Sequence, residues 1–321
     1  MTEPKTNNNT ATVIVSGGAA VTPFTTPEAA CAEGLAAGNT DTFLRQGLLA
    51  AGLQVFTSPA RIGDGQIAED SNWQGFADGP TPLAAEMTVN SVGDIDKAGA
   101  HLARFLGHLE TEYDITTVNL VGHSMGGLFS RAAIRVLQES DSNLQVRTLT
   151  TIGTPWTGAF AADFAHGDLA LAACNGDPAC EAAMTGAKTL DATDSEGAGK
   201  QVTQRYLAGE TDGLGIDGKE QSTAWNDLQQ RVLANIPVVT IGGNHFDKPG
   251  MSRVWPHDGL VALQSALADN VATEVLPQHR SLTFPNVHSI FFSHALDLPW
   301  NLALTWNPLV LEAVIEAIEH P

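Results

Sequence analysis

Short apolar strands alternate with amphipathic helices along most of this sequence, and this alternation constrains the fold more than any other feature. The apolar run Ala11–Val15 is followed by a helical pattern over Thr42–Ala51 and by a second strand at Leu53–Phe56. Alternation of this kind predicts an α/β fold with a mainly parallel central sheet flanked by helices. Four later segments have the composition of further strands: Thr117–Val121, Thr148–Ile152, Pro237–Ile241 and Ser281–Phe284.

Three further helices have clear signals. Ser91 precedes a helix whose apolar stripe extends to Leu109, and Met125–Leu137 has apolar residues spaced by four. The last helix is expected to start at Asn307-Pro308, because a capping residue followed by proline is typical of a helix N-terminus.

One long stretch interrupts the alternation and divides the chain. Residues 158–235 are rich in Ala, Gly and Asp, and long irregular insertions are often lids. We expect 11–157 and 236–321 to form the core, 158–235 to form an inserted cap, and 1–10 to be a flexible tail. Residues 59–90 are rich in Gly, Pro, Asp and Asn, which predicts a long surface loop.

The cap has two candidate helices, Ala159–Ala173 and Ala224–Ala234, and two nearby cysteines. Cys174 and Cys180 flank a turn-forming segment and could close a small disulfide loop, which would suggest an oxidising compartment. Two reduced cysteines in a cytosolic protein fit the sequence equally well. The first residues lack the basic head and apolar middle of a signal peptide, so the chain is either cytoplasmic or secreted with its signal peptide already removed.

Charge excludes one class of partner. The chain has 16 Lys and Arg against 36 Asp and Glu, a formal net charge of -20. Phosphate backbones would be repelled, so we expect no nucleic-acid partner. The sequence also lacks an apolar run long enough for an integral membrane segment. The oligomeric state cannot be read from the sequence, and a monomer is the default.

The segment Gly122-His123-Ser124-Met125-Gly126-Gly127 gives the strongest indication of chemistry. A G-x-S-x-G pattern is short, but here an apolar strand precedes it and an amphipathic helix follows it. A serine on such a sharp strand-to-helix turn presents its hydroxyl outward, and flanking glycines leave room for the neighbouring backbone. We therefore predict that Ser124 is a nucleophile.

The chain resembles the α/β-hydrolase fold, and within it the bacterial lipases and esterases. Three segments carry the resemblance: Gly122–Gly127, Thr151–Pro155 and His257–Val261. The resemblance implies an ester-cleaving serine hydrolase with an acyl-enzyme intermediate, no cofactor and no catalytic metal. Its partner would be a small ester or lipid substrate, which places the enzyme in lipid metabolism.

A serine nucleophile needs a base and an orienting carboxylate, and the family's chain order is Ser, acid, His. Asp258 is the chosen acid because it matches the family's Asp-Gly-Leu-Val, with Asp247 as the rival. Asp258 could instead cap a helix over Gly259–Ala268. His288 is the chosen base because it follows the expected final strand, and His294 is its rival.

Two backbone N–H groups should form the oxyanion hole. One is that of Met125, next to the nucleophile. The other is assigned by position to Gly18, in the loop after the first strand, although many lipases have His-Gly where this chain has Ser16-Gly17.

Substrate contacts are assigned to His123, Trp156 and Phe160. The aromatic residues near the expected site could line an acyl pocket or equally pack beneath the cap; they are Trp73, Phe76, Trp156, Phe160 and Phe164. Alternatives to an esterase are an acyltransferase or a polyester hydrolase with the same triad, or a non-catalytic ligand-binding protein on this fold.

Overall fold

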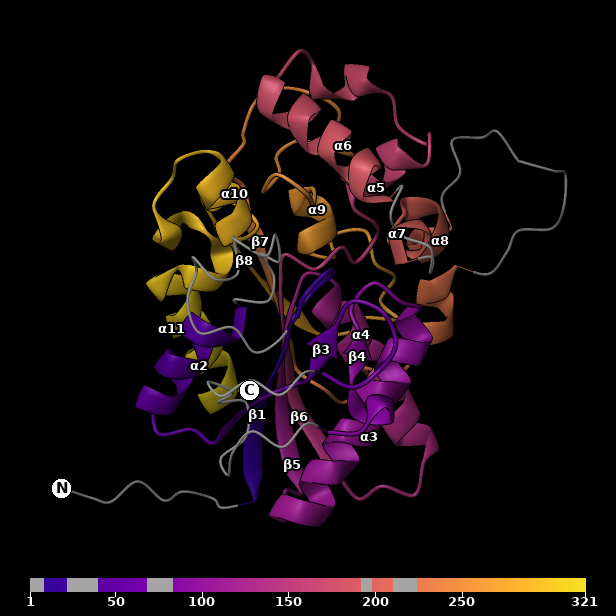
Figure 1. The fold of residues 1–321 in the computed structure, drawn as a ribbon, viewed down its shortest axis with the longest axis vertical. Helices are drawn as coiled ribbons and strands as arrows, with labels where there is room; N and C mark the ends of the chain where they lie inside the picture. Colours follow the sequence, from indigo (N-terminus) through magenta and orange to yellow (C-terminus); the bar gives the residue numbers. More distant parts are fainter. Residues whose placement is uncertain (1–8, 22–39, 68–82, 192–197, 210–223) are drawn as a thin grey trace, which may run out of the picture.

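A six-stranded parallel sheet forms the centre of the protein in a computed structural model (Figure 1). The structure describes residues 9–21, 40–67, 83–191, 198–209 and 224–321. The prediction of a mainly parallel sheet flanked by helices is confirmed. In spatial order the strands are β2 (Val55–Thr57), β1 (Thr10–Val15), β5 (Thr117–His123), β6 (Gln145–Ile152), β7 (Val238–Gly243) and β8 (His279–Phe284).

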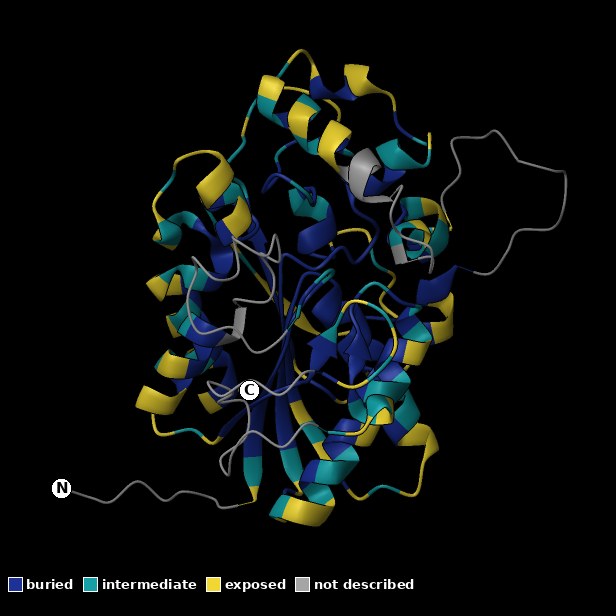
Figure 2. Cartoon of the chain, in the orientation of Figure 1, coloured by how far each residue is buried: buried dark blue, intermediate teal, exposed yellow. Residues whose placement is uncertain are grey.

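Helices cover both faces of this sheet because successive strand residues point to opposite sides. Val13 and Val15 of β1 belong to the apolar cluster beneath one helix pair, whereas Ile14 belongs to the cluster beneath the other. The first pair is α3 (Ile95–Tyr113) and α4 (Met125–Glu139), and the second is α2 (Thr40–Ala50) and α11 (Pro308–Glu319). Figure 2 shows the resulting pattern, with mostly buried central strands and exposed outer faces on the helices, whereas the edge strand β8 contains no buried residue.

The N-terminal region differs from expectation in two places. Thr10 starts β1 and so belongs to the sheet rather than to a tail. Asn9 lies just before the strand, and its carbonyl oxygen accepts hydrogen bonds from the N–H groups of Thr116 and Thr117. Residues 1–8 lie outside the described residues. Ser91 does not cap α3; Asp94 does, by accepting a hydrogen bond from the N–H of Lys97.

The expected surface loop over 59–90 contains regular structure at both of its ends. Strands β3 (Ala60–Arg61) and β4 (Val89–Asn90) form a short parallel pair, and the 3₁₀-helix η2 (Ala85–Met87) precedes β4. Asn90 and Val89 are buried. Residues 68–82, which include Trp73 and Phe76, lie outside the described residues.

Between β6 and β7, helices are the only regular secondary structure among the described residues. The first expected helix, Ala159–Ala173, is too long: α5 ends at Ala165, and Gly167 follows in a left-handed conformation with φ of 81°. The second expected helix, Ala224–Ala234, is also too long, because the structure has only a short 3₁₀-helix there. The elements are α5 (Phe160–Ala165), η3 (Leu171–Cys174), α6 (Pro178–Asp191), α7 (Ala198–Gln201), α8 (Gln204–Ala208) and η4 (Trp225–Gln229).

These inserted helices pack onto the core. Cys174 and Cys180 form a disulfide inside an apolar cluster that also contains Val254 and Trp255 from the segment after β7. In Figure 1, α5 and α6 lie above the carboxyl ends of the strands. No helix among the described residues is long and apolar enough to cross a bilayer.

Short helices complete the C-terminal part. α9 (Leu263–Ala266) follows the segment after β7, and α10 (Ile290–Ala295) follows β8. The 3₁₀-helices η5 (Trp300–Leu302) and η6 (Leu304–Trp306) lead into α11, where Asn307 caps the helix and Pro308 occupies its first turn, as predicted.

Candidate active site

The predicted triad and oxyanion-hole residues all follow the carboxyl ends of strands. Gly18 follows β1, Ser124 follows β5, and His288 follows β8. Carboxyl ends of parallel strands lie at one edge of a sheet, which is where α/β proteins bind their ligands. The sheet topology therefore gathers residues that are more than 100 positions apart in the sequence.

Ser124 occupies a sharp turn between β5 and α4, in a conformation that few non-glycine residues adopt. Its φ is 53° and its ψ is -129°. Such strain persists only where surrounding structure enforces it. Glycines make the turn possible, because a Cβ on Gly122 would lie 2.5 Å from the backbone N of Gly127 and one on Gly126 would lie 2.0 Å from the carbonyl oxygen of Val15.

Ser124, His288 and Asp258 form a continuous hydrogen-bonded chain. The hydroxyl of Ser124 lies 3.0 Å from His288 Nε2, and His288 Nδ1 lies 2.7 Å from Asp258 Oδ2. Asp258 is fully buried and His288 is 3% exposed, whereas Ser124 keeps 7% of its surface. Of the three residues, Ser124 is therefore the most exposed and Asp258 the least.

Asp258 lies in a tight turn rather than at a helix N-terminus. Its Oδ1 accepts hydrogen bonds from the N–H groups of Leu260 and Val261, at 2.9 and 2.8 Å. The helix expected over Gly259–Ala268 is only α9, which starts at Leu263. One carboxylate oxygen therefore holds the turn, and the other is left for His288.

The two alternative residues for the acid and the base, Asp247 and His294, make no hydrogen bond to this triad among the described residues. Asp247 is exposed, and the ring of His294 stacks on Trp300 with their centroids 6.1 Å apart. Neither has a contact with Ser124 among the described residues. The backbone of His288 is also fixed, since its N–H donates to the carbonyl oxygen of Asp258 at 2.8 Å.

The loop after β1 reaches Ser124. A Cβ on Gly17 would lie 2.5 Å from Ser124 Cβ, and one on Gly18 would lie 2.9 Å from Met125 Sδ. Within the described part of the chain, the N–H groups of Gly18 and Met125 have no acceptor. Two backbone N–H donors without an acceptor among the described residues therefore lie beside Ser124. Sequence reasoning missed how closely Gly17 approaches Ser124, although the Gly-Gly pair after a strand was the available signal.

The three predicted substrate contacts are buried side chains that pack against other described residues. His123 and Trp156 are fully buried, and Phe160 is 1% exposed. Trp156 stacks on the guanidinium of Arg131, 4.3 Å from it, and Phe160 packs against the ring of His257. This geometry favours the packing interpretation for Trp156 and Phe160, and their contact with a substrate stays a prediction.

Two buried histidines next to the hydrogen-bonded chain are neutral. Burial, with the nearby His288 adding to it, holds the pKa of His123 well below 6.5. Burial lowers the pKa of His257 to about 4, although the carboxylate of Asp258 opposes this. His257 Nδ1 accepts a hydrogen bond from the N–H of Gly259, so its proton is on Nε2.

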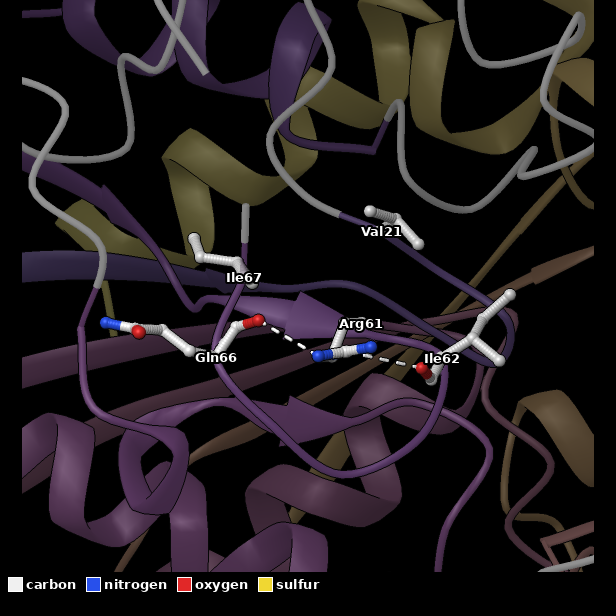
Figure 3. A pocket seen from close by; sticks show the side chains of 5 residues that line it. All are labelled: Val21, Arg61, Ile62, Gln66 and Ile67. Carbon is white, nitrogen blue, oxygen red and sulfur yellow. Dashed lines mark hydrogen bonds between the residues drawn. The ribbon is translucent and has the colours of Figure 1, made fainter. Parts of the chain in front are cut away.

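A cavity of about 300 Å³ lies beside the loop after β1 (Figure 3). Three aliphatic side chains and the side chain of Gln66 line it together with Arg61, whose guanidinium donates to the carbonyl oxygens of Ile62 and Gln66. The hydroxyl of Ser91 lies within hydrogen-bond distance of two carbonyl oxygens, that of Ala20 in the loop after β1 and that of Arg61 at the cavity. The aliphatic residues are Val21, Ile62 and Ile67.

Among the residues that the structure describes, no three His, Cys, Asp or Glu side chains come together as a metal site.

Comparisons with known proteins agree with this architecture. The family model described as "Alpha/beta hydrolase of unknown function (DUF915)" matches residues 62–213. The mature form of the Bacillus licheniformis lipase BlEst2 covers 95% of this chain and 95% of its own, with 15% identity and a TM-score of 0.50. Its propeptide form covers 94% of this chain and 51% of its own, with 15% identity and a TM-score of 0.52.

These similarities establish the fold. The chain has the α/β-hydrolase fold, and its structural neighbours include lipases. None of the curated proteins compared with the sequence matches it.

Proposed function

We propose that the protein is a serine hydrolase of carboxylic esters, with Ser124 as nucleophile, His288 as general base and Asp258 as the orienting acid. The observation that carries this proposal is the hydrogen-bonded chain from Asp258 Oδ2 through His288 to the hydroxyl of Ser124. A serine hydroxyl is a poor nucleophile at neutral pH, and a base within hydrogen-bond reach is what activates it.

In the proposed reaction, Ser124 Oγ attacks the ester carbonyl carbon while its proton passes to His288 Nε2. The carboxylate of Asp258 keeps the proton of His288 on Nδ1 and stabilises the imidazolium that forms. Collapse of the tetrahedral intermediate breaks the bond to the alcohol oxygen, which takes the proton from His288. Water then attacks the acyl-enzyme by the same route, with His288 again as base, and releases the acid.

The N–H groups of Met125 and Gly18 would stabilise the negative oxygen of the tetrahedral intermediate. Support comes from their position beside Ser124 and from the absence of any other acceptor for them among the described residues. Loss of one such donor typically costs about 100- to 1000-fold in rate.

The test compares Ser124→Ala with Ser130→Ala on p-nitrophenyl esters of short and long acids. Ser130 is a matched control because it is a buried serine of the same helix whose hydroxyl donates to the carbonyl oxygen of Gly126. We expect Ser124→Ala to lose at least about 1000-fold in kcat. Ser130→Ala should stay within about twofold of the wild type, since removing such a bond within a helix costs little.

Equal turnover by wild type and Ser124→Ala would refute the proposal. Retained ester binding without turnover in the wild type would instead identify a binding protein. Addition of an alcohol to the reaction separates hydrolysis from acyl transfer, because a transferase would release the new ester in place of the free acid.

A further inference from the structure

His123, the residue immediately before Ser124, contacts the backbone of the proposed base. Its Nε2 lies 3.0 Å from the carbonyl oxygen of His288, and the two rings have their centroids 4.9 Å apart. A carbonyl oxygen can only accept, so Nε2 of His123 is the donor and carries the proton. Both residues are buried, which excludes water as a competitor for this bond.

The peptide groups on both sides of His288 Cα are therefore fixed by other parts of the site. The preceding N–H donates to the carbonyl oxygen of Asp258, in the turn that carries the acid. The following carbonyl oxygen accepts from His123, at the end of β5. The loop after β8 is thus held between the turn that carries the acid and the turn that carries the nucleophile.

We propose that His123 is a positioning residue, which holds the backbone of His288 so that His288 Nε2 stays within reach of the Ser124 hydroxyl. This inference rests on the proposed function and adds a role for a residue that the reaction itself does not use. His123 is fully buried, and its proposed effect passes through His288.

The neutral state of His123 fits this role. A second positive charge beside His288 would oppose formation of the imidazolium during turnover, whereas a neutral ring supplies a donor without that charge. Burial keeps the pKa of His123 well below its ordinary value, so the ring stays neutral.

The positioning role predicts a loss in kcat rather than in substrate binding. A displacement of the reacting groups by about 1 Å can cost about 100-fold in rate. His123→Met removes the donor while filling a similar volume, and His123→Gln keeps an N–H donor near the place of Nε2. We expect His123→Met to lose about 10- to 100-fold in kcat, with KM within about twofold of the wild type.

The pair of variants separates positioning from packing. His123→Gln should recover kcat to within about fivefold of the wild type, and both variants should melt at similar temperatures. Unchanged kcat in His123→Met would overturn the proposal. Equal losses of kcat in Met and Gln variants, with equal falls in melting temperature, would identify a packing role and also overturn it.

A second measurement does not depend on turnover. In ¹⁵N NMR of histidine-labelled Ser124→Ala protein at pH 7, the His123 ring should be neutral, with a slowly exchanging proton on Nε2. A ring protonated on both nitrogens, or an Nε2 proton that exchanges as in free imidazole, would overturn the proposal. If no ester is hydrolysed by the wild type, the proposed function fails, and this spectrum still decides whether His123 holds the His288 carbonyl.

Discussion

Gly17, in the loop after β1, lies very close to the turn that carries Ser124. An added Cβ on Gly17 would lie 2.5 Å from Ser124 Cβ, 2.9 Å from the carbonyl oxygen of His123 and 3.2 Å from the Ser124 hydroxyl. Real Cβ atoms do not approach other atoms this closely, so one of the two turns would have to move. Neither can move freely, because one carries the strained serine and the other carries Gly18.

Gly17→Ala should therefore lower kcat by about 100-fold or more, since it displaces the nucleophile from its base by about 1 Å. Gly107→Ala is the control: Gly107 lies within α3, and a Cβ there would meet nothing within 4 Å. That change should leave kcat unaltered and raise stability by about 1 kcal/mol, because alanine favours a helix more than glycine does. Steady-state kinetics and thermal melting measure both effects. Full activity in Gly17→Ala would contradict the close approach.

At the scale of elements, one buried carboxylate joins the inserted helices to the core. Asp163 of α5 accepts a hydrogen bond from the N–H of Gln204 in α8, at 2.8 Å. Its other oxygen pairs with Arg253, after β7, at 3.0 Å. Burial raises the pKa of Asp163, while Gln204 and Arg253 oppose that shift.

Asp163→Ala should lower the free energy of unfolding by about 2–3 kcal/mol, because it removes the buried carboxylate that accepts hydrogen bonds from both Arg253 and the Gln204 N–H. Urea denaturation followed by tryptophan fluorescence measures this. The exposed pair of Arg280 with Glu316 serves as control, and Glu316→Ala should leave the midpoint unchanged, since water screens exposed ion pairs. Equal effects of both substitutions would show that Asp163 is not an anchor.

The sequence was sufficient to predict those helices and strands in which the local pattern and the tertiary packing favour the same structure. The strand and helix around Ser124 were predicted because strand alternation, glycines and a helical stripe all indicate one structure. The helix expected after Asp258 does not start there, because the carboxylate instead accepts from the turn Leu260–Val261 and from His288 in the loop after β8. Ala159–Ala173 was too long because the left-handed Gly167 ends the helix, and composition does not reveal backbone dihedrals.

In the candidate site, too, some residues could be predicted from the sequence and others could not. Chain order and motif indicated Ser124, Asp258 and His288, and the structure brings these three side chains together. The place of His123 could not be predicted, because its partner is a backbone carbonyl 165 positions away. The contact forms only because the folded sheet places the carboxyl ends of β5 and β8 at the same edge.

At the scale of the whole molecule, buried neutral histidines link stability to pH. His257 is fully buried among the rings of Phe160, Phe246 and Trp255. Its pKa in the folded protein is about 4, against 6.5 for an ordinary histidine. Between these two values the unfolded chain binds a proton that the folded protein does not bind. Stability therefore falls as the pH drops from 6.5 to 4, and His123 acts in the same direction.

This difference in pKa predicts a loss of about 3 kcal/mol in the free energy of unfolding between pH 7 and pH 4 from His257 alone. His257→Asn removes the titrating group and keeps an acceptor for the Gly259 N–H, so its stability should vary less with pH by about that amount. His279→Gln is the control, because His279 is exposed at the start of β8. Urea unfolding at several pH values compares the three proteins. A pH dependence in His257→Asn as steep as in the wild type would mean that His257 is not the group that opposes protonation, and the burial argument for it would then be wrong.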